Sequence, residues 1–139
     1  EIGTKKVKLN HVYLERDKND FISYEEVEKN FTKLNKNKKI KYLEFEKWYL
    51  NQLKILTDLV YKVDALPIFI TQTTGYGHSF ESFIVARTII KHCNINNLSC
   101  LNLAKDLNLK YEDFYDESHL NIIGSKKMAE YIYANISIF

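Results

Sequence analysis

The sequence has no long apolar run and no strong excess of charge of either sign. Its longest uninterrupted apolar stretch, Ala65 to Ile70, is far shorter than the roughly 20 residues that a membrane-spanning helix needs. The formal net charge is +2, and basic and acidic residues are mixed along the chain. We therefore expect neither a membrane nor a nucleic acid as a partner.

Cysteine is scarce, and the two residues present, Cys93 and Cys100, have no metal-ligand spacing. Cys100 falls in an apolar run that predicts a buried strand, so we expect two reduced core thiols rather than a disulfide. Reduced thiols favour a reducing, cytoplasmic environment for a soluble protein. No signal peptide is recognisable in the sequence, and the compartment stays open.

Apolar periodicity is well developed, and 45% hydrophobic residues suffice for the core of a single domain over residues 1–139. Residues 44–63 place apolar side chains every three or four positions, which predicts an amphipathic helix. Short apolar runs at 66–71 and 98–103 are typical of buried strands, and residues 80–93 predict a helix between them. A last helix is predicted after Asn121, a suitable N-cap.

This alternation over residues 44–139 indicates an α/β fold in which the two strands are adjacent, parallel and nearly inaccessible to solvent. Ligands of such sheets bind beyond the carboxyl ends of the strands. The loop from Thr71 to His78 and the loop before the last helix are therefore the expected functional edge. Within it, Gln72, Thr73 and Tyr76 are candidate substrate-binding residues.

The first 43 residues are polar and predict irregular structure. Val7 to Asn10 is a possible further strand, and Val12 to Lys41 predicts loop or short helix. Residues 17–26 resemble a calcium-binding loop and recur, loosely, eighteen positions later. The resemblance fails on chemistry, because Phe21 takes a ligand position and Ile22 takes the place of the turn glycine.

The chemistry-bearing pattern is Asp116-x-x-His119 in a loop that leads into the last helix. A carboxylate three residues before a histidine can bond the Nδ1 proton and leave Nε2 free to act as a base. This is the pair that activates a nucleophile in hydrolysis. Gly124, in the first turn of the helix, suits close packing of the helix against the sheet. A loop salt bridge or a helix-capping pair is the structural alternative.

The pattern D-x-x-H-L-N-x-x-G-x-x-x-x-A of residues 116–129 resembles the last motif block of the SGNH, or GDSL-type, esterases. The resemblance covers about residues 45–136, with 66–71 similar to the fourth strand of the family and 98–103 to its fifth. It implies a three-layer, flavodoxin-like sandwich with a parallel sheet, His119 as base and Asp116 as its orienter. The implied substrate is a small ester or an acylated carbohydrate, with no metal or organic cofactor.

The family's nucleophilic serine lies in a Gly-Asp-Ser motif after its first strand, and this sequence contains no such motif. Asn10 is a candidate oxyanion donor, because Lys8 to His11 can be matched to the family's Gly-x-Asn-Asp block through the asparagine alone. The matched part lacks the first two strands, which would leave a sheet edge bare. We therefore expect the serine to come from a missing N-terminal segment or from another chain, and we expect residues 1–139 alone to be inactive.

Two other functions are compatible with the sequence. The loop from Thr71 to Ser79 contains Gly75 and Gly77 and would cradle a phosphate in a nucleotide-binding α/β domain. The absence of a serine motif is also compatible with a non-catalytic binding module derived from a hydrolase. His11, His78 and His92 have no evident catalytic partners and are expected to be solvated or satisfied side chains.

Overall fold

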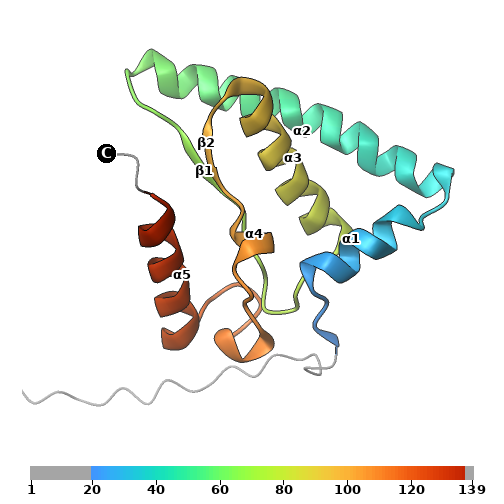
Figure 1. Cartoon of the computed structure of the whole chain (residues 1–139). Helices are drawn as coiled ribbons and strands as arrows, with labels where there is room; N and C mark the ends of the chain where they lie inside the picture. The colour runs from blue at the N-terminus through green and yellow to red at the C-terminus, as the bar shows by residue number, and fades with distance from the viewer. Residues whose placement is uncertain (1–19, 137–139) are drawn as a thin grey trace, which may run out of the picture.

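The computed structural model describes residues 20–136, which form a mixed α/β structure that is mostly helical (Figure 1). Its one sheet within these residues has two parallel strands. In chain order the elements are α1 (Tyr24–Thr32), α2 (Lys36–Lys62), β1 (Ile68–Ile70), α3 (Phe80–Asn96), β2 (Ser99–Leu101), α4 (Leu103–Asp106), the 3-10 helix η2 (Tyr111–Asp113) and α5 (Ile122–Asn135). The possible strand Val7 to Asn10 lies outside the described residues.

The prediction of two adjacent parallel strands joined through a helix is confirmed. Ile68, Phe69 and Ile70 pair in register with Ser99, Cys100 and Leu101. The intervening helix α3 begins at a reciprocal cap, in which Ser79 and Ser82 each bond the other's backbone N–H. It ends at Asn97, whose left-handed backbone (φ 52°) reverses the chain toward β2.

Helices cover both faces of the small sheet, as Figure 1 shows for α2 and α3 on one side and α5 on the other. Phe69 and Cys100 pack with Leu53 of α2 and Ile89 of α3. Ile70, on the opposite face, packs in a second cluster with Met128 and Tyr131 of α5. The split follows from the period of two along a strand, which sends neighbouring side chains to opposite faces.

The expectation that both strands are nearly inaccessible is wrong. Ile68 is 36% exposed and the preceding Leu66 is 74% exposed, while Leu101 of β2 is buried. In the described part of the chain β1 pairs only with β2, so its other edge has no neighbouring strand. An unpaired edge leaves side chains and backbone groups open to water, which a central strand would not do.

The expectation of loop or short helix in Val12 to Lys41 agrees with the nine-residue helix α1, but the long helix α2 also begins before residue 44. Ser23 caps α1 by accepting the N–H of Glu26, and α1 buries Tyr24, Val27 and Phe31. Asn35 caps α2 through the N–H of Lys38, so this helix starts eight residues earlier than its apolar pattern indicated.

A buried carboxylate joins the two long helices. Glu46 of α2 is 6% exposed and accepts hydrogen bonds from Arg87 at 2.5 Å and from Lys91 at 3.0 Å, both on α3. Burial by itself raises the pKa of Glu46, but the two cationic donors outweigh it and hold the pKa below its usual value.

The expectation of two reduced thiols is contradicted, because Cys93 and Cys100 form a disulfide. Their Cα atoms lie 6.2 Å apart, at the end of α3 and in the middle of β2. The chain reverses direction at Asn97, so β2 runs back beside the end of α3. This brings the side chains of Cys93 and Cys100 together.

Candidate active site

The loop that contains Asp116 and His119 is closed by its own backbone. Phe114 bridges Leu120 in antiparallel fashion, and the N–H of Tyr115 donates to the carbonyl of His119 at 2.8 Å. The N–H of Asn121 donates to the carbonyl of Asp113 at 2.9 Å. The two ends of the loop are thus held together at the start of α5.

Within this loop the structure brings Asp116 and His119 together. Nδ1 of His119 lies 2.9 Å from both carboxylate oxygens of Asp116. Oδ1 also accepts the backbone N–H groups of Ser118 at 2.8 Å and of His119 at 2.9 Å. Glu117 takes no side-chain part in these bonds. Among the described residues Nε2 of His119 has no hydrogen-bond partner, and the side chain is 77% exposed.

These hydrogen bonds also favour the ionised form of the Asp116 carboxyl. The N–H of Ser118, followed by the His119 ring and the His119 N–H, holds the pKa of the Asp116 carboxyl below its usual range. An ionised carboxylate only accepts hydrogen bonds, so the ring nitrogen facing it carries a proton. The arrangement therefore leaves Nε2 as the nitrogen that is able to accept one.

An ion pair between a buried carboxylate and a partly exposed lysine joins the start of this loop to α5. Asp113 is 3% exposed, and both of its carboxylate oxygens lie 2.8 Å from Nζ of Lys127 on α5. Asn121 adds a second link, because its side chain caps α5 at Ile123 and Gly124 and donates to the carbonyl of Glu112. Loop and helix are thereby fixed to one another. No pattern in the sequence distinguishes Asp113 and Lys127 from the other charged residues.

Gly124 has a role different from the one predicted. It faces the loop rather than the sheet: a Cβ at this position would collide with the carbonyl oxygen of Asp113 and meet the Leu120 side chain at 2.9 Å. The absence of a side chain therefore lets α5 start directly against the 3-10 turn that precedes the Asp116 loop.

The glycine loop after β1 packs against the same site. The N–H of Gly75 donates to the carbonyl of Glu117 at 2.8 Å, and a Cβ on Gly75 would collide with the carbonyl oxygen of Asp116. The N–H groups of Gly77 and His78 donate to Thr74 and Ile22. Because these amides are already used within the protein, the geometry offers little to the phosphate of the nucleotide-binding alternative.

His119 borders a cavity of about 280 Å³. Gln72 and Thr73, two of the candidate substrate-binding residues, line this cavity together with Ser118, Ser125 and Met128. Tyr76, the third candidate, is not among its lining residues. Asn10, the candidate oxyanion donor, lies outside the described residues.

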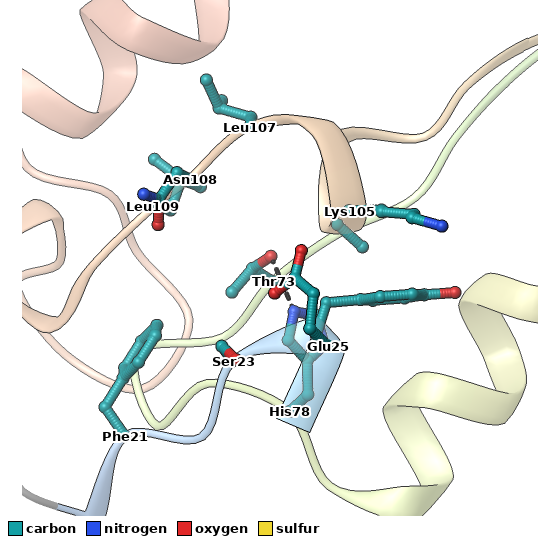
Figure 2. A pocket seen from close by; sticks show the side chains of 11 residues that line it. Phe21, Ser23, Glu25, Thr73, His78, Lys105, Leu107, Asn108 and Leu109 are labelled. Atoms are coloured by element: carbon teal, nitrogen blue, oxygen red, sulfur yellow. Dashed lines mark hydrogen bonds between the residues drawn. The ribbon is translucent and has the colours of Figure 1, made fainter. Parts of the chain in front are cut away.

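A second cavity of about 340 Å³, drawn in Figure 2, shares the lining residues Thr73 and Leu109 with the first. His78 lines it, is 3% exposed, and approaches the Thr73 hydroxyl through Nε2 at 3.2 Å. Burial lowers the pKa of His78, while the Ala104 backbone and Glu25 act in the opposite direction.

The other histidines agree in part with expectation. The ring of His92 is buried and satisfied, with Nε2 2.9 Å from the Thr57 hydroxyl and Nδ1 3.2 Å from the Asn96 amide. His11 lies outside the described residues. Within residues 20–136 no group of three His, Cys, Asp or Glu side chains is arranged to hold a metal ion. No helix in that range combines the length and apolar character that crossing a membrane requires.

Comparisons of the chain with protein-family models, with curated proteins and with solved structures find no match.

Proposed function

We propose that this chain carries the base and its orienter of an SGNH-type serine ester hydrolase. The observation that supports the proposal is the 2.9 Å contact of Asp116 with Nδ1 of His119, which leaves Nε2 without a partner beside a cavity. Two backbone N–H groups also stabilise the charge of the carboxylate.

In the proposed reaction Nε2 of His119 takes the proton of a serine hydroxyl as the serine oxygen attacks the ester carbonyl. The imidazolium then gives this proton to the departing alcohol, and an acyl-serine remains. Water, deprotonated by the same nitrogen, attacks the acyl-serine to release the acid and restore the serine. Asp116 stays ionised throughout and stabilises the imidazolium.

The serine belongs to a segment that pairs with the part described here. The sequence supports this, because it contains no Gly-Asp-Ser motif that could supply the serine. We propose that the complete sheet is the centre of a three-layer, flavodoxin-like sandwich. The segment comes either from sequence upstream of residue 1 or from a second chain, and the upstream genomic sequence would reveal a Gly-Asp-Ser motif after an apolar strand.

A fluorophosphonate probe tests the proposal on the natural protein that contains this chain. An activated serine displaces fluoride and becomes covalently phosphonylated, and mass spectrometry of the digest locates the modified residue. We expect labelling at a single serine and loss of labelling and ester cleavage in His119→Ala. Asp116→Asn should lose as much labelling and ester cleavage as His119→Ala, or less, because it leaves the base in place.

Glu117→Gln is the matched control, because it removes an adjacent carboxylate that takes no part in the pair. Residues 1–139 alone should neither be labelled nor cleave p-nitrophenyl acetate. Histidine-independent labelling of the natural protein, or ester cleavage that survives His119→Ala, would contradict the proposal. Complete absence of labelling would favour the non-catalytic binding module.

A further inference from the structure

Helix α2 carries a row of large apolar side chains on its exposed side. The helix faces the core through Glu46, Leu53 and Thr57, which are buried. On another side, positions three, four or seven residues apart bear apolar side chains that are between 37% and 74% exposed: Phe45, Trp48, Ile55, Leu56, Leu59 and, at the end of the helix, Val63. Residues at these spacings share one face of a helix, so they form a continuous strip, the α2 stripe.

The α2 stripe has the character of an interaction surface. Single exposed apolar residues are common on proteins, whereas contiguous apolar patches mark sites of association. Figure 1 shows α2 along one edge of the molecule, with α3 packed along one side of it. The ring centroid of Phe45 lies 5.7 Å from that of Trp48, and Phe45 stacks on Tyr49. Trp and Tyr are enriched among the residues that dominate binding energy at protein interfaces.

Charged residues border the α2 stripe on one flank and indicate what it binds. Glu44 and Lys47 lie near its start, Asp58 and Lys62 lie near its end, and all four are exposed. Eighteen residues make about five turns of helix, so Glu44 and Lys62 lie on the same side. If a second α2 ran antiparallel, with a two-fold axis near residue 53, Glu44 would face Lys62 of the second copy. Lys47 would likewise face Asp58, whereas a parallel pair in register would place like charges together.

We propose that the α2 stripe binds the α2 stripe of a second copy of this chain in an antiparallel pair with two-fold symmetry. Self-complementary interfaces of this kind are the commonest in oligomers. The helix has 27 residues and is about 40 Å long, so the contact is extended. Ile55 lies near the axis and meets its own copy, and Trp48 lies against Leu59 of the second copy. The pairing is independent of the proposed hydrolase, because the α2 stripe contains no residue of the His119 site.

Trp48 gives a direct measurement of the pairing, because it is the single tryptophan of the chain. Its side chain is 57% exposed in one copy and is shielded from water in the pair. Residues 1–139 should sediment as a reversible mixture of monomer and dimer. The tryptophan emission should shift to shorter wavelength as the protein concentration rises, and both changes should give the same dissociation constant.

Ile55→Asp tests the apolar part of the contact. It should weaken the dimer by about tenfold or more, because it places two carboxylates near the axis in a site that excludes water. The side chain is 48% exposed in one copy, so its loss should leave the fold intact. Circular dichroism and urea unfolding verify that this variant and the charge variants are folded.

An exchange of charges tests the antiparallel arrangement. Glu44→Lys and Lys62→Glu should each weaken the dimer, because each places like charges opposite one another across the pair. The double variant restores opposite charges and should regain the affinity of the natural chain. Glu130→Lys, at an exposed position of α5 on the other side of the sheet, is the matched control and should dimerise as the natural chain does.

A chain that stays monomeric at every concentration, or a dimer that survives Ile55→Asp, would overturn the proposal. A double charge variant that dimerises no better than the single ones would overturn the antiparallel arrangement. The natural protein that contains this chain is measured in the same way. If it is monomeric while residues 1–139 dimerise, the α2 stripe is covered by another segment of that protein, and the second copy is ruled out as its partner.

Discussion

The backbone N–H of Gly75 donates a 2.8 Å hydrogen bond to the carbonyl of Glu117, so the loop after β1 is fastened directly to the loop that holds Asp116 and His119. The two loops meet at the carboxyl end of the sheet, where the parallel arrangement brings together segments that lie more than thirty residues apart in sequence. A side chain on Gly75 would stand in the space that Asp116 occupies.

Gly75→Ala should therefore destabilise the protein and displace the Asp116 loop. The added Cβ would collide with backbone that is held on both sides, and overpacking of this kind costs about 1–3 kcal/mol. Urea unfolding measures the cost, and the NMR signals of the His119 ring report the displacement. Asn94→Ala, on the exposed surface of α3, should change stability by less than about 0.5 kcal/mol. Equal stability of the two variants would contradict the close approach.

Lys127→Met should destabilise the protein more than Lys126→Met. Lys127 neutralises the buried carboxylate of Asp113, whereas Lys126 is 76% exposed and meets Glu130 only at 3.8 Å. Loss of Lys127 leaves a buried charge without its counter-ion, which costs about 1–3 kcal/mol once the 41% exposure of Lys127 is considered. Chemical unfolding of the two variants, made at adjacent positions of α5, provides the comparison. Similar losses would show that the pair contributes little.

Elements with a regular apolar pattern were predictable from the sequence. The β1–α3–β2 unit and α5 were found because short apolar runs and three- or four-residue spacings reflect burial directly. For α1 the prediction remained loop or short helix, although Ser23 and Glu26 form the start signal of a helix and Tyr24, Val27 and Phe31 share a face. Polar residues outnumber apolar ones in α1, so the spacing of its three apolar residues was too weak a pattern to predict a helix.

The candidate pair was predictable for a different reason, because Asp116 and His119 are close in sequence and their contact is local. The contacts that hold the site in place were not predictable. Gly75 with Asp116 and Asp113 with Lys127 are contacts that only the fold creates. The disulfide was mispredicted because two cysteines carry no information on pairing until the turn at Asn97 is known.

Reduction of the disulfide between Cys93 and Cys100 should lower stability by about 2–3 kcal/mol. A closed loop this short restricts the unfolded chain by roughly that amount. Urea unfolding with and without dithiothreitol measures the effect. Alkylation of the unfolded, unreduced protein by iodoacetamide should leave both cysteines unmodified. Two alkylated cysteines without reductant would show that the thiols are free, as the sequence suggested.

Glu46→Gln should make the protein less sensitive to acid as well as less stable at neutral pH. Because Arg87 and Lys91 hold the pKa of Glu46 below its ordinary value of 4.5, the unfolded chain takes up the proton first. The stability that Glu46 contributes is therefore present above pH 4.5 and is lost as the pH falls through the lower, folded pKa.

Unfolding free energies at pH 7 and at pH 4 test this, with Glu44→Gln as the control at an exposed position of the same helix. The Glu46 variant should lose about 1–2 kcal/mol at pH 7, and its difference from the natural chain should narrow at pH 4. A difference that widens toward acid would contradict the ion pair.

The last prediction concerns the proton of the His119 ring, and residues 1–139 suffice to test it. Because both oxygens of Asp116 lie 2.9 Å from Nδ1, the neutral ring should carry its proton on Nδ1 and present Nε2 as an acceptor. Long-range ¹H–¹⁵N NMR distinguishes the two tautomers. Asp116→Asn should weaken the preference, since an amide is neutral and one of its two polar atoms is a donor, whereas Glu117→Gln should leave it unchanged. A ring protonated on Nε2 in the natural chain would remove the acceptor on which the proposed reaction depends, whatever the source of the serine.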